Sequence, residues 1–566
     1  MGVDRISLTV GFVDLSSFDE LEVFFYGGRS KNAFRKSIRR SSWFTLIASQ
    51  LNRPSSSPNF GEEFVGIFSR SGDYIRDVWM RCTIPAIKSK RPYQARWTTN
   101  LGHNLIEEAY LQFNDLQACR ITSQYMDFWS AFTLTKSKDL GYQNMIGSTL
   151  DLTSPYLLRE SNHDANAGTQ ISQGPVDLPS KTLNIPIPFP FTRSSEDSLC
   201  HAMAPFNDIK IHVKLRKLAD LLHFDLLGEN WMFPYDATAD GGVAASKTKT
   251  APVAHNVADN LVSSHSSVIG SIVRNVGAGS HSLFGAAAVT PDAAVENYNT
   301  LKLTDVQLWC HYAIIPNMDR DALGDEVEHD VIVEQYHHVN PVPWSPATAN
   351  TLSVDIRMSH SIRHIMFGVQ NTTIHSEWSN YGTHHTVPVC AHPNSLFNER
   401  SVAAVRQGSE IPGNEDPIAR ASLQYEGVDR VNMTWDYFSF VVPFYTCPAI
   451  PEKDGFHILN YGNNITEIQP GGSTNLSRIA HTVLALEASP MAKALNSETH
   501  PGLIALPQNS TLKKAFDDKK SAISAYWAAD NVNYRDQFKN TYNAHIILTG
   551  ITLQRYGGGT VGYPII

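Results

Sequence analysis

Side chains that could do chemistry occur in adjacent pairs along this sequence, so we first ask what each pair could bind. Histidines are adjacent at His337 and His338 and again at His384 and His385. Adjacent side chains on a strand point to opposite faces, so neither pair alone can close around a metal ion. The sequence holds no HExxH pattern or comparable ligand spacing. We therefore predict loop or interface histidines and no metal site.

Acidic side chains are also paired, at 62–63, 107–108 and 517–518, in unrelated segments. Glycoside hydrolysis needs two carboxylates on either side of one bond, an arrangement that sequence alone cannot demonstrate. The chain has neither a GxSxG nucleophile elbow nor a cysteine-nucleophile signature. We therefore predict no catalytic residue and no enzyme activity, and keep a β-rich hydrolase as an alternative.

Phosphate-binding glycine loops are incomplete. The string "GAGSHS" supplies Gly277 and Gly279 but lacks a third glycine and a preceding strand, and no GK[ST] occurs. We interpret it as a flexible loop and predict no cofactor. Sequons for asparagine glycosylation are interpreted as chance matches or turn residues, and they lie at Asn371, Asn432, Asn464, Asn475 and Asn509.

Cysteines are scattered, without a CxxC or CxxH pair that would indicate a zinc site or a disulfide-rich module. This spacing predicts buried free thiols in a reducing compartment, with disulfides as a minor alternative. The six residues are Cys82, Cys119, Cys200, Cys310, Cys390 and Cys447.

Alternation of apolar and polar residues dominates the elements that must position these side chains. It predicts strands with one face in a core, most clearly in "NDIKIHVKLR" (207–216) and "DVQLWCHYAII" (305–315). The string "YFSFVVPFY" (437–445) is also interpreted as a strand. Similar runs are "TLSVDIRM", "HTVLALEA" and "NAHIILTGITL". Many short strands between Gly, Pro, Asn and Ser clusters predict sandwiches or barrels.

Helical patterns are few. The string "SSFDELEVFF" places Ser17 and Glu20 at capping-box spacing. The string "STLKKAFDDKKSAISAYW" (510–527) repeats apolar residues at helical spacing. A third candidate, "DRDALGDEVEHDVIVEQ" (319–335), follows a predicted strand, and we interpret it as a connector between two β-domains.

Length and composition predict two to four domains with large covered surfaces. The chain has 566 residues, of which 42% are hydrophobic and only 18% charged, against about 25% charged in typical proteins. Residues 224–300 are rich in Ala, Gly, Ser and His and show little alternation. We interpret them as a long insertion near the end of the first β-domain.

Membrane and targeting signals are not recognised. The start "MGVDRISLTV" has no basic region followed by an apolar one, and Ile6 stands where myristoylation needs Ser or Thr. No run of about 18 apolar residues occurs, which predicts a soluble or assembled protein. A basic stretch at 27–40, "GGRSKNAFRKSIRR", stands out in a chain of net charge −9.

A series of strings occurs in the order seen in one protein family. They include "GFVDLSSFDELE", "FYGG", "FGEEF", "RWTTNLGHNLIEEAYLQFND", "YMDFWSAFT", "IPIPFPFTR", "VIVEQ", "HSIRHIMFGVQN", "QPGGSTNLSRI" and "GYPII". In these strings the chain resembles iridovirus major capsid proteins over nearly its whole length. It departs from them at 224–300 and in "SSEDSLCHAMAPFNDI", which follows "FTR".

The resemblance implies an all-β fold of two tandem eight-stranded antiparallel jelly rolls, a double jelly roll with short helices and long loops. It implies an N-terminal segment at 1–30, a first jelly roll at 31–318, a connector at 319–350 and a second jelly roll at 351–566. It also implies a homotrimeric, pseudo-hexagonal capsomer that tiles an icosahedral shell around an internal membrane and double-stranded DNA. The implied partners are further copies of the chain, neighbouring capsomers, and minor capsid and penton proteins. The implied location is the virion, after assembly in the host cytoplasm.

The basic stretch would then lie near the base of the capsomer. Arg35, Lys36, Arg39 and Arg40 could contact an anionic internal membrane, with about 1 kcal/mol of attraction for each cation. Alternatively they are solvated or paired with acids of a neighbouring subunit. Direct nucleic-acid binding is not expected, because the membrane would separate shell from genome. A different reading of the chain is a β-sandwich binding module, such as a carbohydrate-binding surface protein.

Overall fold

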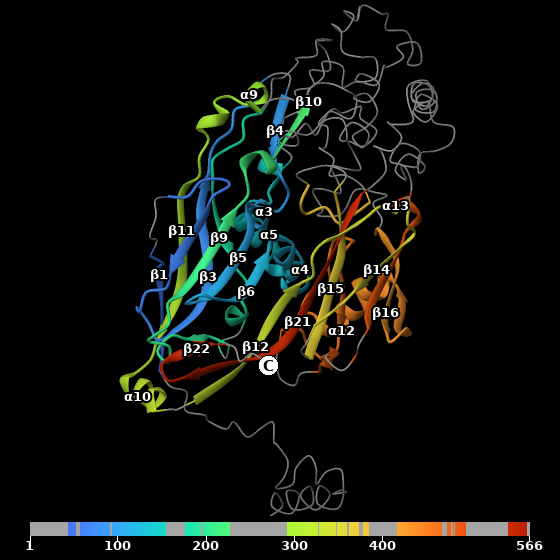
Figure 1. Cartoon of the computed structure of the whole chain (residues 1–566). Helices are drawn as coiled ribbons and strands as arrows, with labels where there is room; N and C mark the ends of the chain where they lie inside the picture. Colours follow the sequence, from blue (N-terminus) through green and yellow to red (C-terminus); the bar gives the residue numbers. More distant parts are fainter. Residues whose placement is uncertain are drawn as a thin grey trace, which may run out of the picture.

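Antiparallel strands are the main secondary structure of the chain, in a computed structural model that describes residues 43–226, 291–493 and 541–562 apart from internal gaps, of which 156–175 and 384–415 are the longest. Four sheets, each built on a path of four strands, lie side by side in Figure 1. We number them first to fourth from the β1 side to the β16 side. The first and second sheets belong to the first half of the chain, and the third and fourth to the second half.

In the first half the strands alternate between two sheets. The order of the first sheet is β1 (Thr45–Gln50), β11 (Thr304–Ile314), β3 (Tyr74–Ile84) and β7 (Lys181–Pro186). The order of the second is β2 (Glu63–Ile67), β9 (Ile209–Leu215), β5 (Ile106–Phe113) and β6 (Leu116–Thr122). If these eight strands are numbered along the chain, the two sheets have the orders 1-8-3-6 and 2-7-4-5.

The second half repeats this order. The third sheet contains β12 (Glu328–His338), β21 (Tyr542–Gly557), β15 (Ser361–Asn371) and β18 (His457–Asn460). The fourth contains β14 (Thr351–Asp355), β20 (Thr482–Ala488), β16 (Ile418–Tyr425) and β17 (Val428–Thr434). Numbered along the chain, these strands again give 1-8-3-6 and 2-7-4-5. Two eight-stranded sandwiches of one topology confirm the predicted double jelly roll.

Short strands extend these sheets or pair beside them. They are β8 (Leu199–Cys200) on β3, β13 (Val342–Trp344) and β22 (Thr560–Gly562) on β21, β19 (Thr474–Asn475) on β15, and the separate pair of β4 (Tyr93–Trp97) with β10 (Leu222–Leu226). The α9 helix (Pro291–Ala294) and the 3-10 turn at 298–300 also lie in the range 224–300, and residues 227–290 of the predicted insertion lie outside the described residues.

Helices follow the fifth strand in both halves. In the first half the chain from β6 to β7 contains α4 (Ser123–Thr133), α5 (Lys136–Ile146) and α6 (Leu150–Thr153). In the second half the chain from β17 to β18 contains the π-helix η5 (Tyr437–Val441) and α12 (Val442–Thr446). The strand predicted at 437–445 is therefore wrong. A continuous apolar run satisfies both the strand and the helix period, and Pro443 suits the first turn of a helix.

The predicted connector is only partly helical. The α10 helix spans Asn317–Asp325, and the chain then enters β12, which pairs with β21 along its whole length. Both β12 and β13 lie inside 319–350 and belong to the third sheet. The helix predicted across 319–335 is thus wrong beyond Asp325, because backbone pairing with β21 provides hydrogen bonds for "EHDVIVEQYHH" as a strand.

The predicted alternation of buried and more exposed residues is confirmed in the strands of the sheets. In β9 the residues Ile209, Ile211, Val213 and Leu215 are buried, while the basic residues and His212 between them are partly exposed. Two apolar clusters fill the sandwiches, and the cluster of the first half extends into the second through Tyr336, Met366 and Ile547, among others. The two halves therefore pack against each other through buried side chains and are not joined by the connecting segment alone.

Candidate functional site

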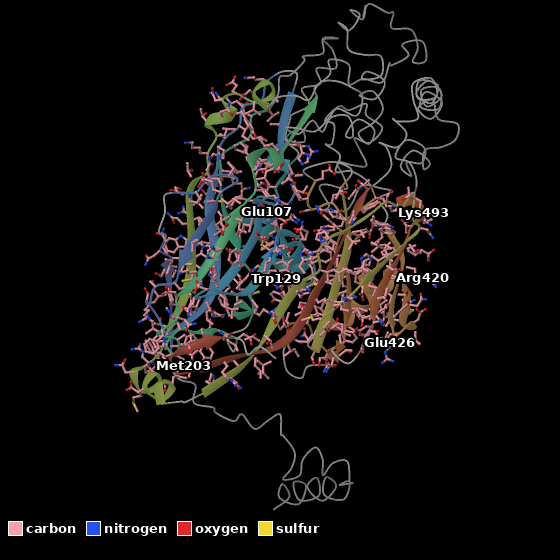
Figure 2. All side chains as sticks on the ribbon, in the orientation of Figure 1. Glu107, Trp129, Met203, Arg420, Glu426 and Lys493 are labelled. Atoms are coloured by element: carbon pink, nitrogen blue, oxygen red, sulfur yellow. The ribbon has the colours of Figure 1, made fainter. Side chains whose placement is uncertain are left out.

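The contact between the two halves combines buried apolar side chains with hydrogen bonds and ion pairs, and we call it the seam. From the first half it takes β6, α4, the short α3 helix (Leu101–Leu105) and the turn η3 (Leu218–Asp220). From the second half it takes the outer face of the third sheet together with residues 377–383 and 449–465. Trp129 of α4 is labelled where the halves meet in Figure 2.

The apolar centre of the seam is the ring of Phe128, which α4 carries across to the second half. Thr122 caps this helix by accepting a hydrogen bond from the Tyr125 amide, and the cap fixes where α4 begins. The Phe128 ring meets Tyr381 and Phe456 edge-on, with centroids 5.3 and 5.1 Å away. A Cβ at Gly368 would lie 2.7 Å from this ring, so only glycine allows β15 to approach so closely.

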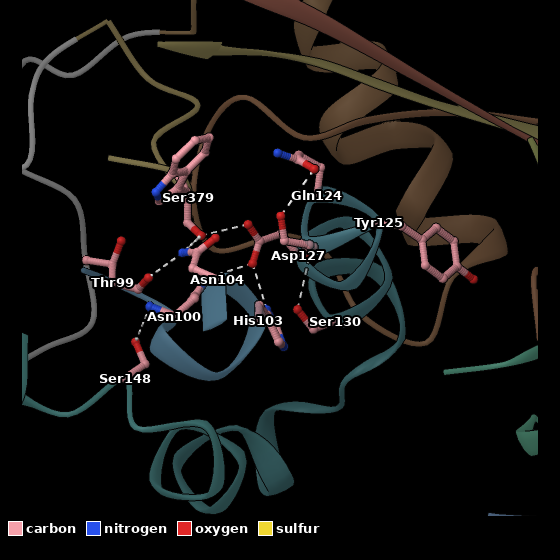
Figure 3. Close-up of polar contacts among 12 residues, drawn as sticks. Thr99, Asn100, His103, Asn104, Gln124, Tyr125, Asp127, Ser130, Ser148 and Ser379 are labelled. Carbon is pink, nitrogen blue, oxygen red and sulfur yellow. Dashed lines mark hydrogen bonds and ion pairs between the residues drawn. The ribbon is translucent and has the colours of Figure 1, made fainter. Parts of the chain in front are cut away.

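Asp127, one residue earlier, binds donors from both halves (Figure 3). Its Oδ1 accepts from Asn100 Nδ2 at 3.0 Å and lies 2.7 Å from His103 Nδ1. Its Oδ2 accepts from Ser379 Oγ at 2.7 Å and from the Tyr381 hydroxyl at 3.2 Å. An ionised carboxylate has enough lone pairs for all four. Asp127 therefore holds residues 379–381 of the second half against α3 and α4 of the first.

Arg216 makes a parallel link at the end of β9. Its guanidinium donates to Asn104 O at 3.0 Å and to Ser123 Oγ at 2.8 Å, and lies 3.8 Å from the centre of the Trp378 ring. Burial lowers the pKa of Arg216 to about 10, so the guanidinium remains charged at neutral pH. A cation stacked on an aromatic face away from water strengthens the attraction between the halves.

A buried charge cluster lies on the outer face of the third sheet. Glu334 of β12 forms ion pairs with Arg193 of the first half and Arg363 of β15, and all three side chains are buried. Arg363 also donates to Asn464 O at 2.8 Å, and Arg193 to Ile465 O at 3.3 Å. Burial, with Arg193 nearby, lowers the pKa of Arg363 to about 10. One carboxylate thus forms ion pairs with cations from both halves.

Two buried histidines form a relay at the end of β12. His338 Nδ1 lies 3.0 Å from the Thr122 hydroxyl and its Nε2 lies 3.2 Å from His545 Nδ1. His545 Nε2 in turn lies 2.9 Å from Gln370 Oε1. With one proton on each ring, every nitrogen in this relay has a partner, whereas a second proton on His545 would face the N–H of His338. The arrangement therefore favours neutral rings.

Acid is expected to weaken the seam through this relay. Burial, together with nearby cationic groups, lowers the pKa of His338 to about 4 and that of His545 to about 3. Both pKa values lie below those of the unfolded chain, so the stabilisation is complete above about pH 6.5 and is lost as the pH falls toward 4. Each histidine then contributes a slope of about 1.4 kcal/mol per pH unit to the free energy of unfolding. Changing both histidines to Gln should make the free energy of unfolding depend less steeply on pH over this range. The same change at the exposed residue His481 should leave the dependence unaltered. A double variant whose free energy of unfolding depends on pH as steeply as that of the wild type contradicts this assignment.

A second contact joins the far end of β21 to the first half. The Cys200 amide donates to the Tyr556 hydroxyl at 2.9 Å, and Asn207 Nδ2 donates to Val561 O at 2.9 Å. The Phe206 amide donates to Gly559 O at 3.0 Å. Residues near the end of the chain thus complete the packing of residues 200–207.

Two of the acidic residues singled out in the sequence lie in contacts with basic side chains. Glu63 lies 3.1 Å from His212 Nδ1, and Glu107 lies 3.1 Å from Lys214 Nζ, on the outer face of the second sheet. Within the described part of the chain, no group of three or more His, Cys, Asp or Glu side chains is placed to hold a metal ion. His384, His385 and the pair at 517–518 lie outside the described residues.

Of the other features noted in the sequence, the predicted buried free thiols are confirmed at Cys82, Cys119, Cys200 and Cys310. Cys447 is free but only half-buried, and Cys390 lies outside the described residues. Burial raises the pKa of Cys82, Cys119 and Cys310 to about 12 each, which suits inert core thiols. The basic stretch at 27–40, with Arg35, Lys36, Arg39 and Arg40, lies outside the described residues, as do the helices predicted around Ser17 and at 510–527. Among the described helices, none is long and apolar enough to cross a bilayer.

Two family models match the chain. The model described as "Major capsid protein N-terminus" matches residues 32–254, and the model described as "Large eukaryotic DNA virus major capsid protein" matches residues 319–532. The chain is 32% identical to the major capsid protein of Costelytra zealandica iridescent virus, with 100% of both sequences covered. It is 34% identical to that of Simulium iridescent virus, over 87% of this chain and 89% of the relative.

Solved structures support the fold. The Faustovirus major capsid protein aligns with a TM-score of 0.55 and 9% sequence identity, over 97% of both chains. A chain of the PBCV-1 virus capsid aligns with a TM-score of 0.56 and 13% identity, over 94% of this chain and 100% of the other. At such low identity these likenesses concern the fold alone.

Proposed function

Since this chain belongs to the major capsid proteins of large eukaryotic DNA viruses, and is therefore a structural component of the virion shell, we propose that three copies assemble into a homotrimeric capsomer of pseudo-hexagonal outline. Such capsomers tile an icosahedral shell. The family is one of structural proteins, and the chain acts through the surfaces that it presents to its neighbours rather than through a reaction.

One observation carries the proposal: the two sandwiches repeat the same strand order and are fixed side by side by the seam. Three such chains supply six similar units, the number that a hexagonal outline needs. A ring of this kind closes only if the angle between the two units of each chain is constant. The buried links at Asp127, Arg216 and Glu334 provide that constancy.

The mass of the purified protein tests this proposal. Light scattering or native mass spectrometry is expected to give three times the 62.8 kDa of the chain, and negative-stain images should show a hexagonal outline. A chain that remains monomeric at micromolar concentration contradicts the proposal. A monomer that instead binds sugars on a glycan array would favour the binding-module alternative.

Further partners belong to the same proposal. We expect contacts with neighbouring capsomers and with minor capsid and penton proteins, and peripheral contact of Arg35, Lys36, Arg39 and Arg40 with an internal membrane. Flotation with anionic liposomes tests the membrane contact, since changing the four cations to Gln should abolish it and unchanged binding contradicts it. As domains we propose a first jelly roll at 31–318 and a second that extends from 351–566 back to include β12.

A further inference from the structure

The repeated topology makes the seam a template for a contact that the single chain cannot make. In the seam the fifth strand of the first half, β6, and the helix that follows it, α4, cover the outer face of the third sheet. The equivalent elements of the second half are β17, η5 and α12, and the sheet equivalent to the third is the first. In Figure 1 β1 and β11 of the first sheet lie at one edge of the molecule, whereas α12 and β16 lie in the other half.

The fifth strands of the two halves differ sharply in exposure. In β6 the residues Ala118, Cys119, Ile121 and Thr122 are buried, and β12 of the second half lies against this strand. Cys119 and Ile121 lie opposite core residues of β5, whereas Thr122 contacts His338 of β12. In β17 every residue except the half-buried Val431 is exposed. The same element is thus covered in one half and bare in the other.

The helical segments after these strands show the same difference. Seven residues of α4 are buried, whereas η5 and α12 expose large apolar side chains, with Phe444 65% and Tyr445 76% exposed. Together with β17 they form what we call the strand-five surface, which consists of Val428, Met433, Phe440, Val441, Phe444 and Tyr445. Exposed large apolar side chains on neighbouring elements favour a contact with another protein.

The outer faces of the first and third sheets also differ in exposure, since among the described residues that of the third sheet is covered by the first half and that of the first sheet is not. On the third sheet Tyr336, Met366 and Ile547 are buried against the first half and belong to its core cluster. On the first sheet the register places Ala48 opposite His311, and Trp309 opposite Trp79, so all four share one face. The two tryptophan rings stack with centroids 6.3 Å apart, yet both remain half-exposed, and Leu46 and Ala48 beside them are exposed.

We propose that the strand-five surface of one copy docks on the outer face of the first sheet of a second copy, at Leu46, Ala48, Trp79, Trp309 and His311. This inference rests on the proposed homotrimer and names the contact that closes it. Because the two surfaces are different, the contact is heterologous, and each chain gives one surface and receives the other. Each subunit contact then reproduces the seam, and the aromatic side chains on both sides supply the anchors that dominate interface energies.

Two double variants are designed, each of which disrupts one of the two proposed contact surfaces. Phe444→Glu with Tyr445→Glu places charge on the strand-five surface, and Leu46→Glu with Ala48→Glu places it on the first sheet. All four side chains are exposed in the single chain, so circular dichroism and thermal unfolding of the subunit should be unchanged. Each variant should raise the concentration at which half of the chains assemble by at least about 30-fold. Met318→Glu, a change at an apolar residue of α10 that is 83% exposed, is the matched control and should assemble normally.

Mixing the two variants tests the heterologous arrangement. Each retains the surface that the other lacks, so a mixture is expected to form 1:1 pairs with twice the mass of the chain and no closed ring. If the wild type is trimeric and the variants assemble as well as the wild type does, this inference is overturned while the proposed function stands. If the sheet variant should misfold, Trp309→Ala gives the same readout on the same face. A wild-type chain that stays monomeric overturns the proposed function itself.

Discussion

Replacing Glu334 by Gln is expected to lower the free energy of unfolding of the subunit by about 3–5 kcal/mol, since it removes the carboxylate that forms ion pairs with two buried cations. Glu334 forms ion pairs with Arg193 and Arg363, and water cannot replace it because all three side chains are buried. The glutamine keeps the shape of the side chain, so the loss reports charge rather than volume. Chemical denaturation followed by far-UV circular dichroism measures it.

Asp330 provides the matched control on the same strand. It pairs with Arg555, with Nε–Oδ1 at 2.9 Å, but the two side chains are 37% and 48% exposed. Asp330→Asn should therefore leave the unfolding midpoint unchanged within error. The triple replacement Arg193→Met, Glu334→Leu and Arg363→Met should recover more than half of the loss, because it removes the buried carboxylate together with the two cations that pair with it. An unaltered midpoint for Glu334→Gln would refute the role assigned to this carboxylate.

Shortening Phe128 to Ala is expected to cost about 3–5 kcal/mol by leaving a cavity between the halves. The ring is fully buried and touches Tyr381 and Phe456, and the close approach of Gly368 leaves β15 little freedom to collapse into the space. Because the cavity lies in the seam, the variant should also assemble poorly even where each sandwich remains folded. Thermal unfolding and light scattering report these two effects separately.

Leu140 of the neighbouring helix α5 is the control for this prediction. It is 73% exposed, so Leu140→Ala should change the free energy of unfolding by no more than about 0.5 kcal/mol. Were Phe128→Ala to melt and assemble like the wild type, the seam would not be what fixes the two halves. Proteolysis that separates intact halves of the variant, but not of the control, would support the argument further.

The sandwich strands could be predicted because their periodicity is local. The alternation in β9, β11, β14 and β20 needs no knowledge of partners, since each strand has one buried and one more exposed face. The segment at 437–445 could not be assigned in this way. A run of aromatic and β-branched residues fits either period, and only the surrounding structure makes it helical.

The seam could not be predicted from the sequence, because its partners are far apart in the chain. Asp127 and Ser379 are separated by 252 residues, and Asn104 and Ser379 by 275. No short spacing marks them, and buried polar residues such as Glu334 look like surface residues until a partner is seen. The resemblance to capsid proteins indicated two jelly rolls side by side, but it did not identify the side chains that hold them together.

The contact between the end of β21 and residues 200–207 sets an order of events during synthesis. Asn207 and Val561 are 354 residues apart, so at about 5–20 residues per second the ribosome needs roughly 20 to 70 s to deliver the second partner after the first. Through that interval the Cys200 amide and the Asn207 side chain lack their final hydrogen-bond partners. A nascent or truncated chain therefore has an incompletely packed first sandwich, and incomplete products differ from finished subunits before any shell is built.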